Sequence, residues 1–337
     1  MTAPSAEAAL ARALPFVDDA VRSGRIPGAV LGVVAQDGAQ AVAARGFAAT
    51  EPERIPVSAA TVFDLASLTK PIFTTTEMLR RSEAGAIDLG APLSATIPDI
   101  RYYEPDAPER ALTARALLGH RTFLPAVEPL YTYGQDPTTL RAFILQRAWK
   151  HGPPVYSDIN FMLLGIALER LEGKLLGDFR LEGGFTFRPD PAACASTERC
   201  PWRGRVLRGE VHDENAFALG GAAGHAGLFG SVADVLGFAR QILAGEGWSD
   251  TMLAAITTPV STTRTLGWEV RYPDWSGGQA CSPGTIGHTG FTGTGLWIDR
   301  ARGLAWSLLT NRVHPSRFSP SGIMPLRRAV GEAVCGA

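Results

Sequence analysis

The chain has 337 residues, of which 45% are hydrophobic and 19% charged, and its formal net charge is −1. This composition is typical of a globular protein with one large core or two interwoven ones. The balanced charge provides no basic surface for nucleic acid or for an anionic membrane, so we expect neither as a partner.

No apolar run reaches the roughly 20 residues needed to cross a bilayer, and the first residues lack the basic and apolar segments of a signal peptide. We therefore expect a cytoplasmic protein. The four cysteines have no zinc-site spacing, so we expect no metal and no other cofactor. Cys194 and Cys200 could close a small loop, but free or buried thiols are the favoured interpretation.

The first 50 residues predict a helix followed by a β-hairpin. Residues 5–23 have amphipathic helical spacing, and a Pro-Gly pair at 27–28 ends it. Residues 29–35 and 40–47 are β-rich runs separated by an Asp-Gly turn at 37–38, which indicates two antiparallel strands.

The middle of the chain is predominantly helical. Residues 68–81 predict a helix that ends near Gly85. Three further helices are predicted over 112–118, 138–149 and 160–172, and residues 174–215 look irregular.

Strand patterns return towards the C-terminus. Residues 231–243 predict a helix with Ser231 as its N-cap. Four strand-like runs follow, at 265–271, 284–287, 293–299 and 303–311. A last helix is predicted over 325–334.

This order predicts an α/β (α+β) fold, in which strands from both ends of the chain join one antiparallel sheet flanked by the terminal helices. We expect residues 1–75 and 216–337 to form this discontinuous sheet domain. Residues 76–215 would form a helical insertion, with the active site in the cleft between the two.

One short motif points to chemistry. Ser67 and Lys70 are three positions apart, so on a helix both side chains lie on one face and the amine can reach the hydroxyl. Serine needs such a base to become a nucleophile. A helix N-cap serine followed by a solvated lysine is an equally weighted alternative for this motif alone.

Two further triplets fit the first. Tyr156-Ser157-Asp158 precedes a predicted helix, and His288-Thr289-Gly290 lies on a predicted strand before Phe291. Taken alone, Tyr156 would be a packed aromatic residue and the second triplet a plain turn.

Together, the three motifs resemble the serine β-lactamase-like and penicillin-binding-protein-like family. Tyrosine in the middle motif is typical of the class C branch, which includes class C β-lactamases, D-alanyl-D-alanine carboxypeptidases and β-lactamase-like esterases. Residues 112–120, 220–228 and 266–268 are also similar to segments of that family. The resemblance covers nearly the whole chain and implies a β-lactamase/transpeptidase-like fold.

The resemblance implies catalytic roles for Ser67, Lys70 and Tyr156. Ser67 would attack a carbonyl, and Tyr156 would take its proton and pass it to the leaving group. This needs a phenolate supported by positive charge, from Lys70 (whose pKa we expect to be lowered) and from a protonated His288. The oxyanion hole would be the backbone N–H groups of Ser67 and Phe291.

The remaining implied site residues bind substrate. Thr289 lies beside His288, and Gly290 would let a substrate backbone approach the strand edge. Asp158 stands where the family usually has Asn, so an amide donor becomes a carboxylate that only accepts when ionised. From the sequence, we expect Asp158→Asn to leave acylation within about tenfold.

The expected function is that of a serine hydrolase that forms an acyl-enzyme on an amide or ester of a small molecule or peptide. A cell-wall-type peptide or muropeptide amidase, or a D-Ala carboxypeptidase-like enzyme, is the main hypothesis. A β-lactamase-like carboxylesterase is the alternative. A β-lactamase and a non-catalytic peptide sensor are less favoured.

Overall fold

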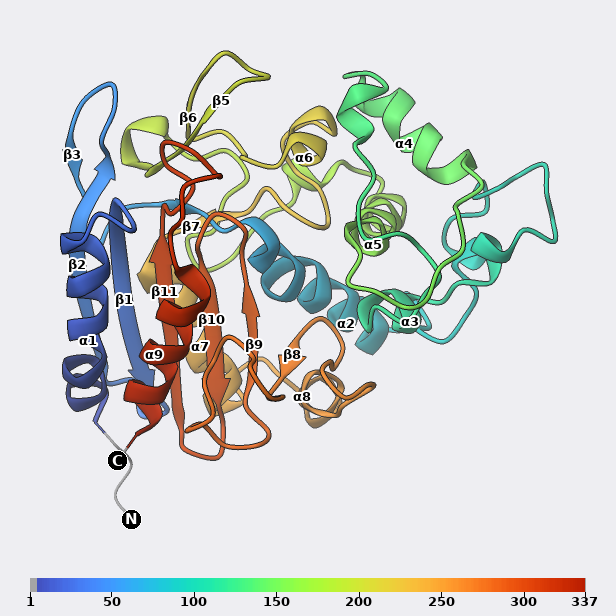
Figure 1. Cartoon of the computed structure of the whole chain (residues 1–337). Helices are drawn as coiled ribbons and strands as arrows, with labels where there is room; N and C mark the ends of the chain where they lie inside the picture. Colours follow the sequence, from blue (N-terminus) through green and yellow to red (C-terminus); the bar gives the residue numbers. More distant parts are fainter. Residues whose placement is uncertain (1–4, 337) are drawn as a thin grey trace.

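The computed structural model describes residues 5–336 and is built around one antiparallel sheet (Figure 1). Its strand order is β3-β2-β1-β11-β10-β9-β8. The strands are β1 (Gly28–Ala35), β2 (Gln40–Ala49), β3 (Ile55–Pro56), β8 (Glu269–Val270), β9 (Ile286–Thr289), β10 (Gly295–Asp299) and β11 (Leu304–Thr310). β1 pairs with β11, with Ala29 opposite Thr310, so the two ends of the chain meet in the middle of the sheet.

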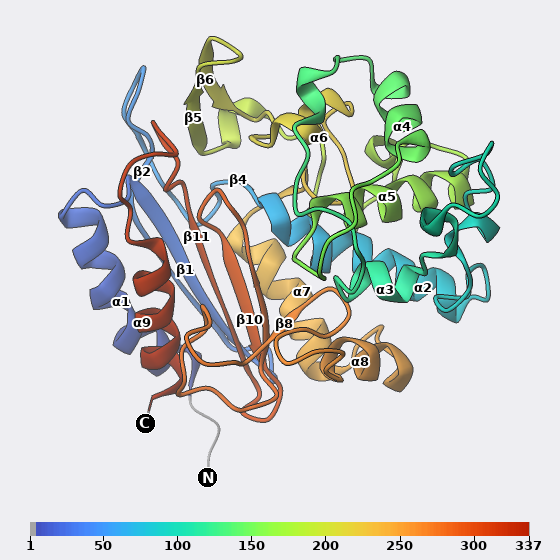
Figure 2. The same ribbon diagram turned by 45° about the vertical axis from the view of Figure 1, so that its right-hand side comes forward.

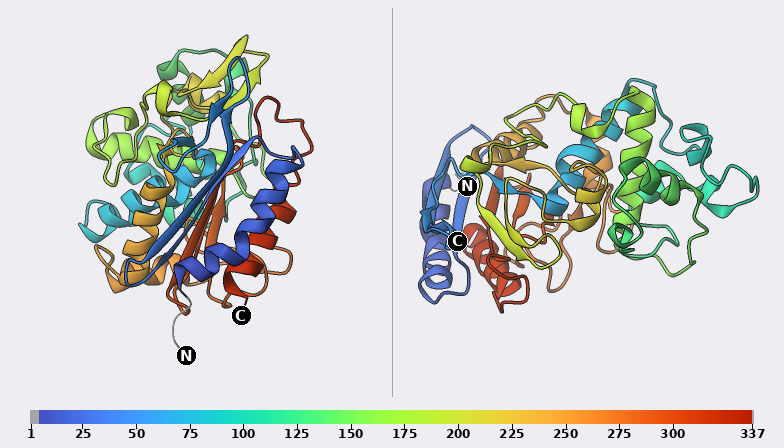
Figure 3. Two further views of the ribbon diagram at one scale, coloured as in Figure 1. Left: turned by 90° about the vertical axis from the view of Figure 1, so that its left-hand side faces the viewer. Right: turned by 90° about the horizontal axis from the view of Figure 1, so that it is seen from above.

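Helices cover both faces of the sheet (Figures 2 and 3). α1 (Ala6–Arg22) and α9 (Ile323–Cys335) lie side by side on one face, and α7 (Val232–Ala244) lies on the other. Because side chains alternate along a strand, β1 contributes Leu31 and Val33 to the first core and Val30 and Val34 to the second.

The other helices lie beside the second face. They are α2 (Thr76–Glu83), α3 (Ala114–Leu118), α4 (Pro137–Gln146), α5 (Asp158–Glu172), α6 (Glu214–Ala218) and α8 (Asp250–Thr257). Most of α5 is buried, and α2, α3 and α4 contact it. Single 3-10 turns occur at Leu93–Ala95, Pro108–Ala111, Leu130–Thr132, Leu176–Asp178 and Pro191–Ala193. The predicted fold class is confirmed.

Several predicted elements are found with small shifts. The hairpin at 29–47 is β1–β2, and the helix at 231–243 is α7. Ser231 is its N-cap, in a capping box with Asp234. All four cysteines are buried and free, so the favoured reading of the thiols is confirmed.

The segment that carries Ser67 differs from the regular helix predicted over 68–81. Ala66–Leu68 is a 3-10 turn and Lys70–Thr75 is a π-helix, and only then does α2 begin. Side-chain contacts hold the wide turn: Thr74 Oγ1 donates to Gly224 O (2.6 Å), and Thr76 Oγ1 donates to Pro71 O (3.1 Å). Apolar spacing cannot distinguish this geometry from an α-helix.

The stretch 174–215 is not irregular throughout. It contains a hairpin of β5 (Ser196–Cys200) and β6 (Arg205–Arg208), which lies above the end of the sheet (Figure 1). Arg199 N–H donates to Pro315 O (2.8 Å) and joins the hairpin to the loop after β11. β4 (Phe63–Asp64) and β7 (Phe229–Gly230) form another short pair beside Ser67. Within residues 5–336, no helix is both long enough and apolar enough to span a membrane.

Candidate active site

Ser67 lines a pocket of about 700 Å³ together with Tyr156, Asp158, His288 and Phe291. Ser67 lies in the 3-10 turn before the π-helix, Tyr156 and Asp158 lie where α5 begins, and His288 and Phe291 lie where β9 ends, so the structure brings together all three motifs. Thr289 and Gly290 line the same pocket.

A constrained backbone presents Ser67. The preceding residue, Ala66, has φ 48°, a conformation that costs free energy for any residue with a Cβ. Asp64 Oδ1 accepts the Ala66 N–H (2.8 Å) and holds it. Thr292 and Thr294 donate to the carbonyls of Asp64 (2.7 Å) and Leu65 (3.0 Å), so the turn after β9 is fixed against the nucleophile segment.

Lys70 is fully buried and its ammonium has three oxygen neighbours. Nζ donates to Ser67 Oγ (2.8 Å) and to His225 O (3.1 Å). Asp158 Oδ1 lies 2.8 Å from Nζ, an ion pair whose angles fall outside hydrogen-bond geometry. Burial lowers the pKa of Lys70, but Asp158 and Tyr156 outweigh burial and raise it. The predicted lowered pKa is wrong because Asp158 supplies the opposite charge.

Tyr156 keeps its proton in this environment. Lys70 Nζ lies 4.9 Å from its ring centroid, and the nearby Lys70 and Ser67 act to lower the pKa of Tyr156. Burial and the Asp158 charge nevertheless raise the pKa of Tyr156 above its ordinary value. A resting phenolate, as expected from the sequence, is therefore disfavoured.

His288 is neutral rather than protonated. Its Nδ1 lies 3.0 Å from Thr289 O, which fixes Nδ1 as the donor, and Nε2 has no partner among the described residues. Burial holds the pKa of His288 well below its usual value, and the charges of Arg264 and Lys70 lower it further. The predicted imidazolium is wrong because burial and these two neighbouring cations disfavour a charged ring.

Two residues that the sequence did not single out adjoin Tyr156. The Arg264 guanidinium carbon lies 4.8 Å from the Tyr156 ring centroid, and Arg264 forms an ion pair with Glu269 (3.2 Å). His120 Nδ1 accepts the Ser157 N–H (3.0 Å), and its ring centroid is 4.6 Å from that of Tyr156. His120 is the last residue of segment 112–120, whose similarity to the family could have marked it as a site residue. No feature of the sequence marked Arg264.

The structure explains the glycine of the third motif. A Cβ on Gly290 would lie 2.5 Å from Leu65 O and 2.1 Å from Thr294 Oγ1. Gly290 therefore lets the end of β9 pack against the nucleophile segment. The space that a Cβ would occupy is filled by protein atoms. Phe291 follows with half of its surface exposed, and it lines the same pocket as Ser67.

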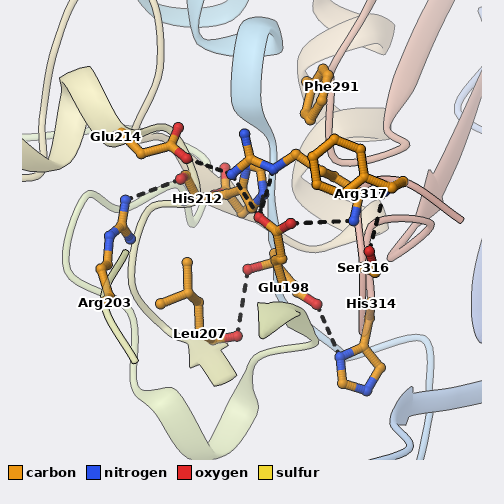
Figure 4. A network of polar contacts seen from close by, with 12 residues as sticks. Glu198, Arg203, Leu207, His212, Glu214, Phe291, His314, Ser316 and Arg317 are labelled. Atoms are coloured by element: carbon orange, nitrogen blue, oxygen red, sulfur yellow. Dashed lines mark hydrogen bonds and ion pairs between the residues drawn. The ribbon is translucent and has the colours of Figure 1, made fainter. Parts of the chain in front are cut away.

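A polar network forms another wall (Figure 4). Glu198 of β5 bonds with His212 (3.0 Å) and Arg317 (2.6 Å), and Arg317 also pairs with Glu214 (2.5 Å). Although burial opposes it, contact with His212 and Arg317 lowers the pKa of Glu198 to about 2. The His212 ring stacks on Phe291, with centroids 5.6 Å apart. Through Glu198, the hairpin β5–β6 thus holds His212 and Arg317 in the pocket wall.

Within residues 5–336, no three or more His, Cys, Asp or Glu side chains are grouped so that they could hold a metal ion. A second cavity, of about 490 Å³, lies between α2, α7 and residues 180–185 and contains none of the motif residues.

Sequence comparison identifies the family. Residues 15–329 match the family described as Beta-lactamase. The chain belongs to the β-lactamase family. This β-lactamase-family enzyme is a hydrolase, and the predicted resemblance is confirmed.

Two curated relatives illustrate the range of the family. The chain is 32% identical to an "N-acetylmuramyl-L-alanine amidase" of Bacillus subtilis strain 168, over 87% of this chain and 79% of that protein. It is 30% identical to a "Putative D-alanyl-D-alanine carboxypeptidase" of Escherichia coli K12, over 79% and 72%.

Solved structures share the fold of this β-lactamase-family chain. Simvastatin synthase from Aspergillus terreus superposes with a TM-score of 0.74 at 19% identity, over 97% of this chain and 98% of that one. EstCE1, a hydrolase with promiscuous acyltransferase activity, also gives 0.74, at 22% identity over 98% and 99%.

Proposed function

We propose that this enzyme hydrolyses an amide bond of a cell-wall-type peptide or muropeptide through an acyl-enzyme on Ser67. The observation that carries the chemistry is the buried chain of contacts Ser67–Lys70–Asp158, with Tyr156 beside it. The names of the two curated relatives support the substrate class.

In the acylation step, Ser67 Oγ attacks the carbonyl carbon. Lys70 takes the Ser67 proton as it passes one of its own to Asp158, so the carboxylate is the terminal base. Tyr156, whose raised pKa keeps it protonated, gives its proton to the leaving nitrogen.

Deacylation reverses the proton transfers. Tyr156, now a phenolate, takes a proton from water as the hydroxide adds to the acyl carbon. Asp158 returns its proton through Lys70 to Ser67 Oγ, which leaves as the hydroxyl. The backbone N–H groups of Ser67 and Phe291 would bind the oxyanion in both steps, each contributing about 3 kcal/mol in such sites.

A carboxylesterase is the second candidate. It is favoured by the neutral His288, which provides no fixed charge at the place where β-lactamases carry lysine. An ester also needs less help from Tyr156, because an alkoxide or phenolate leaves more readily than an amine.

Intact-mass spectrometry with three substrates tests both candidates. The enzyme would be incubated with a muramyl dipeptide, p-nitrophenyl butyrate and nitrocefin, alongside a Ser67→Ala control. We expect turnover of the muramyl amide and acyl adducts that are absent from the control. Ester turnover without amide turnover would replace the amidase with the esterase, and Ser67→Ala activity equal to that of the parent would reject both.

A further inference from the structure

The segment that leads into α6 borders the pocket, and most of its side chains are anchored by neighbours. His212 and Glu214 belong to the polar network of Figure 4. Asn215 Nδ2 donates to Glu128 O (2.8 Å). Asp213 stands among these three anchored residues, so its place in the pocket wall is fixed.

Asp213 is oriented through only one of its two carboxylate oxygens. Oδ1 accepts the Ala216 N–H (2.7 Å) and so caps α6, and His225 Nε2 lies 2.8 Å from the same oxygen. Because an ionised carboxylate can only accept, Nε2 is the donor. Oδ2 has no hydrogen-bond partner among the described residues, and the side chain is 31% exposed and lines the pocket. Oδ2 is therefore available to a ligand.

The surroundings keep Asp213 ionised and in register with the catalytic residues. Burial raises the pKa of Asp213, but contact with His225 and with the Ala216 N–H outweighs burial and lowers it. His225 is itself buried, and its carbonyl accepts from Lys70 (3.1 Å). The residue that orients Asp213 thus also contacts the catalytic amine, which fixes the free oxygen relative to Ser67.

Asp213 lies away from the part of the pocket that serves the leaving group. Tyr156, which protonates the leaving group in the proposed reaction, is adjoined by Arg264 (4.8 Å from its ring centroid) and His288 (5.9 Å between centroids). Asp213 belongs to another wall, which it shares with His212. A leaving group that meets Tyr156 directs the acyl part of the substrate away from Tyr156, so Asp213 is placed to contact the acyl part.

The charges around the pocket favour an uncharged partner for Asp213. The cations are Lys70, Arg264, Arg312, Arg317 and Arg327, and the carboxylates are Asp158, Asp213, Glu214 and Glu269. Because the cations are in excess, an ammonium group of the substrate would be repelled. A hydroxyl or an amide N–H can donate to the free oxygen without adding charge.

We infer that Asp213 Oδ2 accepts a hydrogen bond from an uncharged N–H or O–H group on the acyl part of the substrate, with His225 as its positioning residue. A hydrogen bond to an ionised acceptor is roughly twice as strong as one between neutral groups. This inference rests on the proposed function, because it describes the acyl group that Ser67 receives. In a muropeptide, the sugar hydroxyls and the acetamido N–H are donors of this class.

Two pairs of substrates test this selection. N-acetylmuramyl-L-alanine and (R)-2-methoxypropionyl-L-alanine share the scissile amide, but the second lacks the sugar and its donors. p-Nitrophenyl N-acetylglycinate and p-nitrophenyl 4-oxopentanoate share the ester, but in the second a CH2 replaces the N–H. The readout is the ratio of kcat/KM for the donor-bearing member to that for the donor-free member, with the ester values divided by each ester's rate of alkaline hydrolysis.

Asp213→Asn changes little besides the free oxygen. The asparagine Oδ1 can still accept from Ala216 and His225, and asparagine is as good an N-cap as aspartate. The free oxygen, however, becomes an amide that donates. We expect a parent ratio above one in at least one pair, and a 10- to 100-fold fall of that ratio in Asp213→Asn. Asp213→Ser, which also caps a helix, should show the same fall.

The matched control is Asp136→Asn. Asp136 caps α4 in the same way, through the Thr139 N–H (2.7 Å), but it is exposed and lies outside this pocket. Its ratios should equal those of the parent.

Two variants of His225 test its positioning role. His225→Gln can still donate to Asp213 and should retain most of the preference, whereas His225→Leu cannot donate and should lose it. A purely structural role of His225 would lower kcat/KM for both members of a pair and leave the ratio unchanged.

The outcomes separate the two proposals. Parent ratios of one or less in both pairs, or the same ratios in the parent and in Asp213→Asn, would overturn the role of Asp213. Failure of the parent to hydrolyse either amide would instead overturn the amidase proposal, and the ester pair would then decide the role of Asp213.

Discussion

At the scale of single residues, Asp158 determines how the site is charged. An asparagine at this position could not raise the pKa of Lys70, and it could not accept a proton. The Asp158 carboxylate raises the pKa of Lys70 through an ion pair of 2.8 Å with this fully buried amine. The structure therefore revises the expectation that Asp158→Asn is a mild change.

Asp158→Asn should slow acylation by about 100-fold, within the range of a lost general base. The pKa of Lys70 should fall because burial is then unopposed by its main anionic partner. As a result, residual acylation should rise with pH, since a neutral Lys70 can take the Ser67 proton itself. Stopped-flow measurement of p-nitrophenol release between pH 7 and 10 checks this. Acylation within tenfold of the parent at pH 7 would restore the sequence-based expectation.

Tyr156→Phe should separate the two half-reactions. p-Nitrophenolate leaves without protonation, so acylation by p-nitrophenyl butyrate should change by less than about tenfold. Deacylation loses its base and should slow by 100-fold or more. The expected observation is a burst of one p-nitrophenol per enzyme followed by slow turnover. Tyr131→Phe, outside the pocket, should show no such change, and a Tyr156→Phe enzyme without a burst would reject the assigned role.

The three motifs located these residues from the sequence, but their protonation states could not be predicted. Each state depends on a distance between side chains far apart in the chain and on burial. Lys70 and Asp158 are one example, and His288 with Arg264 is another.

At the scale of elements, the loop formed by residues 220–228 reaches the site by contacting α5 at Gly165. A Cβ on Gly165 would lie 2.8 Å from Gly224 N, and Gly224 precedes the residue whose carbonyl accepts from Lys70. Two backbones thus meet where a side chain would keep them apart.

Gly165→Ala should therefore destabilise the enzyme by about 1–3 kcal/mol, although alanine normally stabilises a helix interior by about 1 kcal/mol. Gly237→Ala is the matched control, because Gly237 lies in α7 with no atom within 4 Å of the added Cβ. It should be neutral or stabilising. Urea unfolding of both variants measures the difference, and equal effects would show that the contact with Gly224 is unimportant.

Periodicity was sufficient to predict the sheet and the long helices, but not the hairpin β5–β6. Its strands have only five and four residues, and Glu198, Arg199, Arg205 and Arg208 interrupt any alternation of apolar side chains. Glu198 is buried because Arg317 and His212 neutralise it, and these partners are invisible in a local window.

At the scale of the whole molecule, buried histidines make stability depend on pH. Burial lowers the pKa values of His120, His288 and His314 below the ordinary 6.5. Below pH 6.5 the unfolded chain then binds more protons than the folded one. The free energy of unfolding should therefore fall as the pH drops from 7 to 5, by up to about 1.4 kcal/mol per pH unit for each histidine.

Urea unfolding at pH 7.5 and 5.5 measures this dependence. His314→Gln should show a smaller fall, because His314 lies outside the pocket and glutamine can replace its bonds to Thr197 O and Thr50 N. Stability that is constant or increases towards pH 5.5 would contradict the assignment of neutral histidines.

The pairing of β1 with β11 has a consequence for biosynthesis. On the ribosome, Ser67 emerges more than 200 residues before the last strand that completes the sheet, and Asn311, just after that strand, accepts the Gly28 N–H. Closing so long a loop is slow and comes late in folding. A polypeptide terminated before β11 would carry the nucleophile but lack the pocket that makes it reactive, so hydrolytic capacity arises only once β11 has been synthesised.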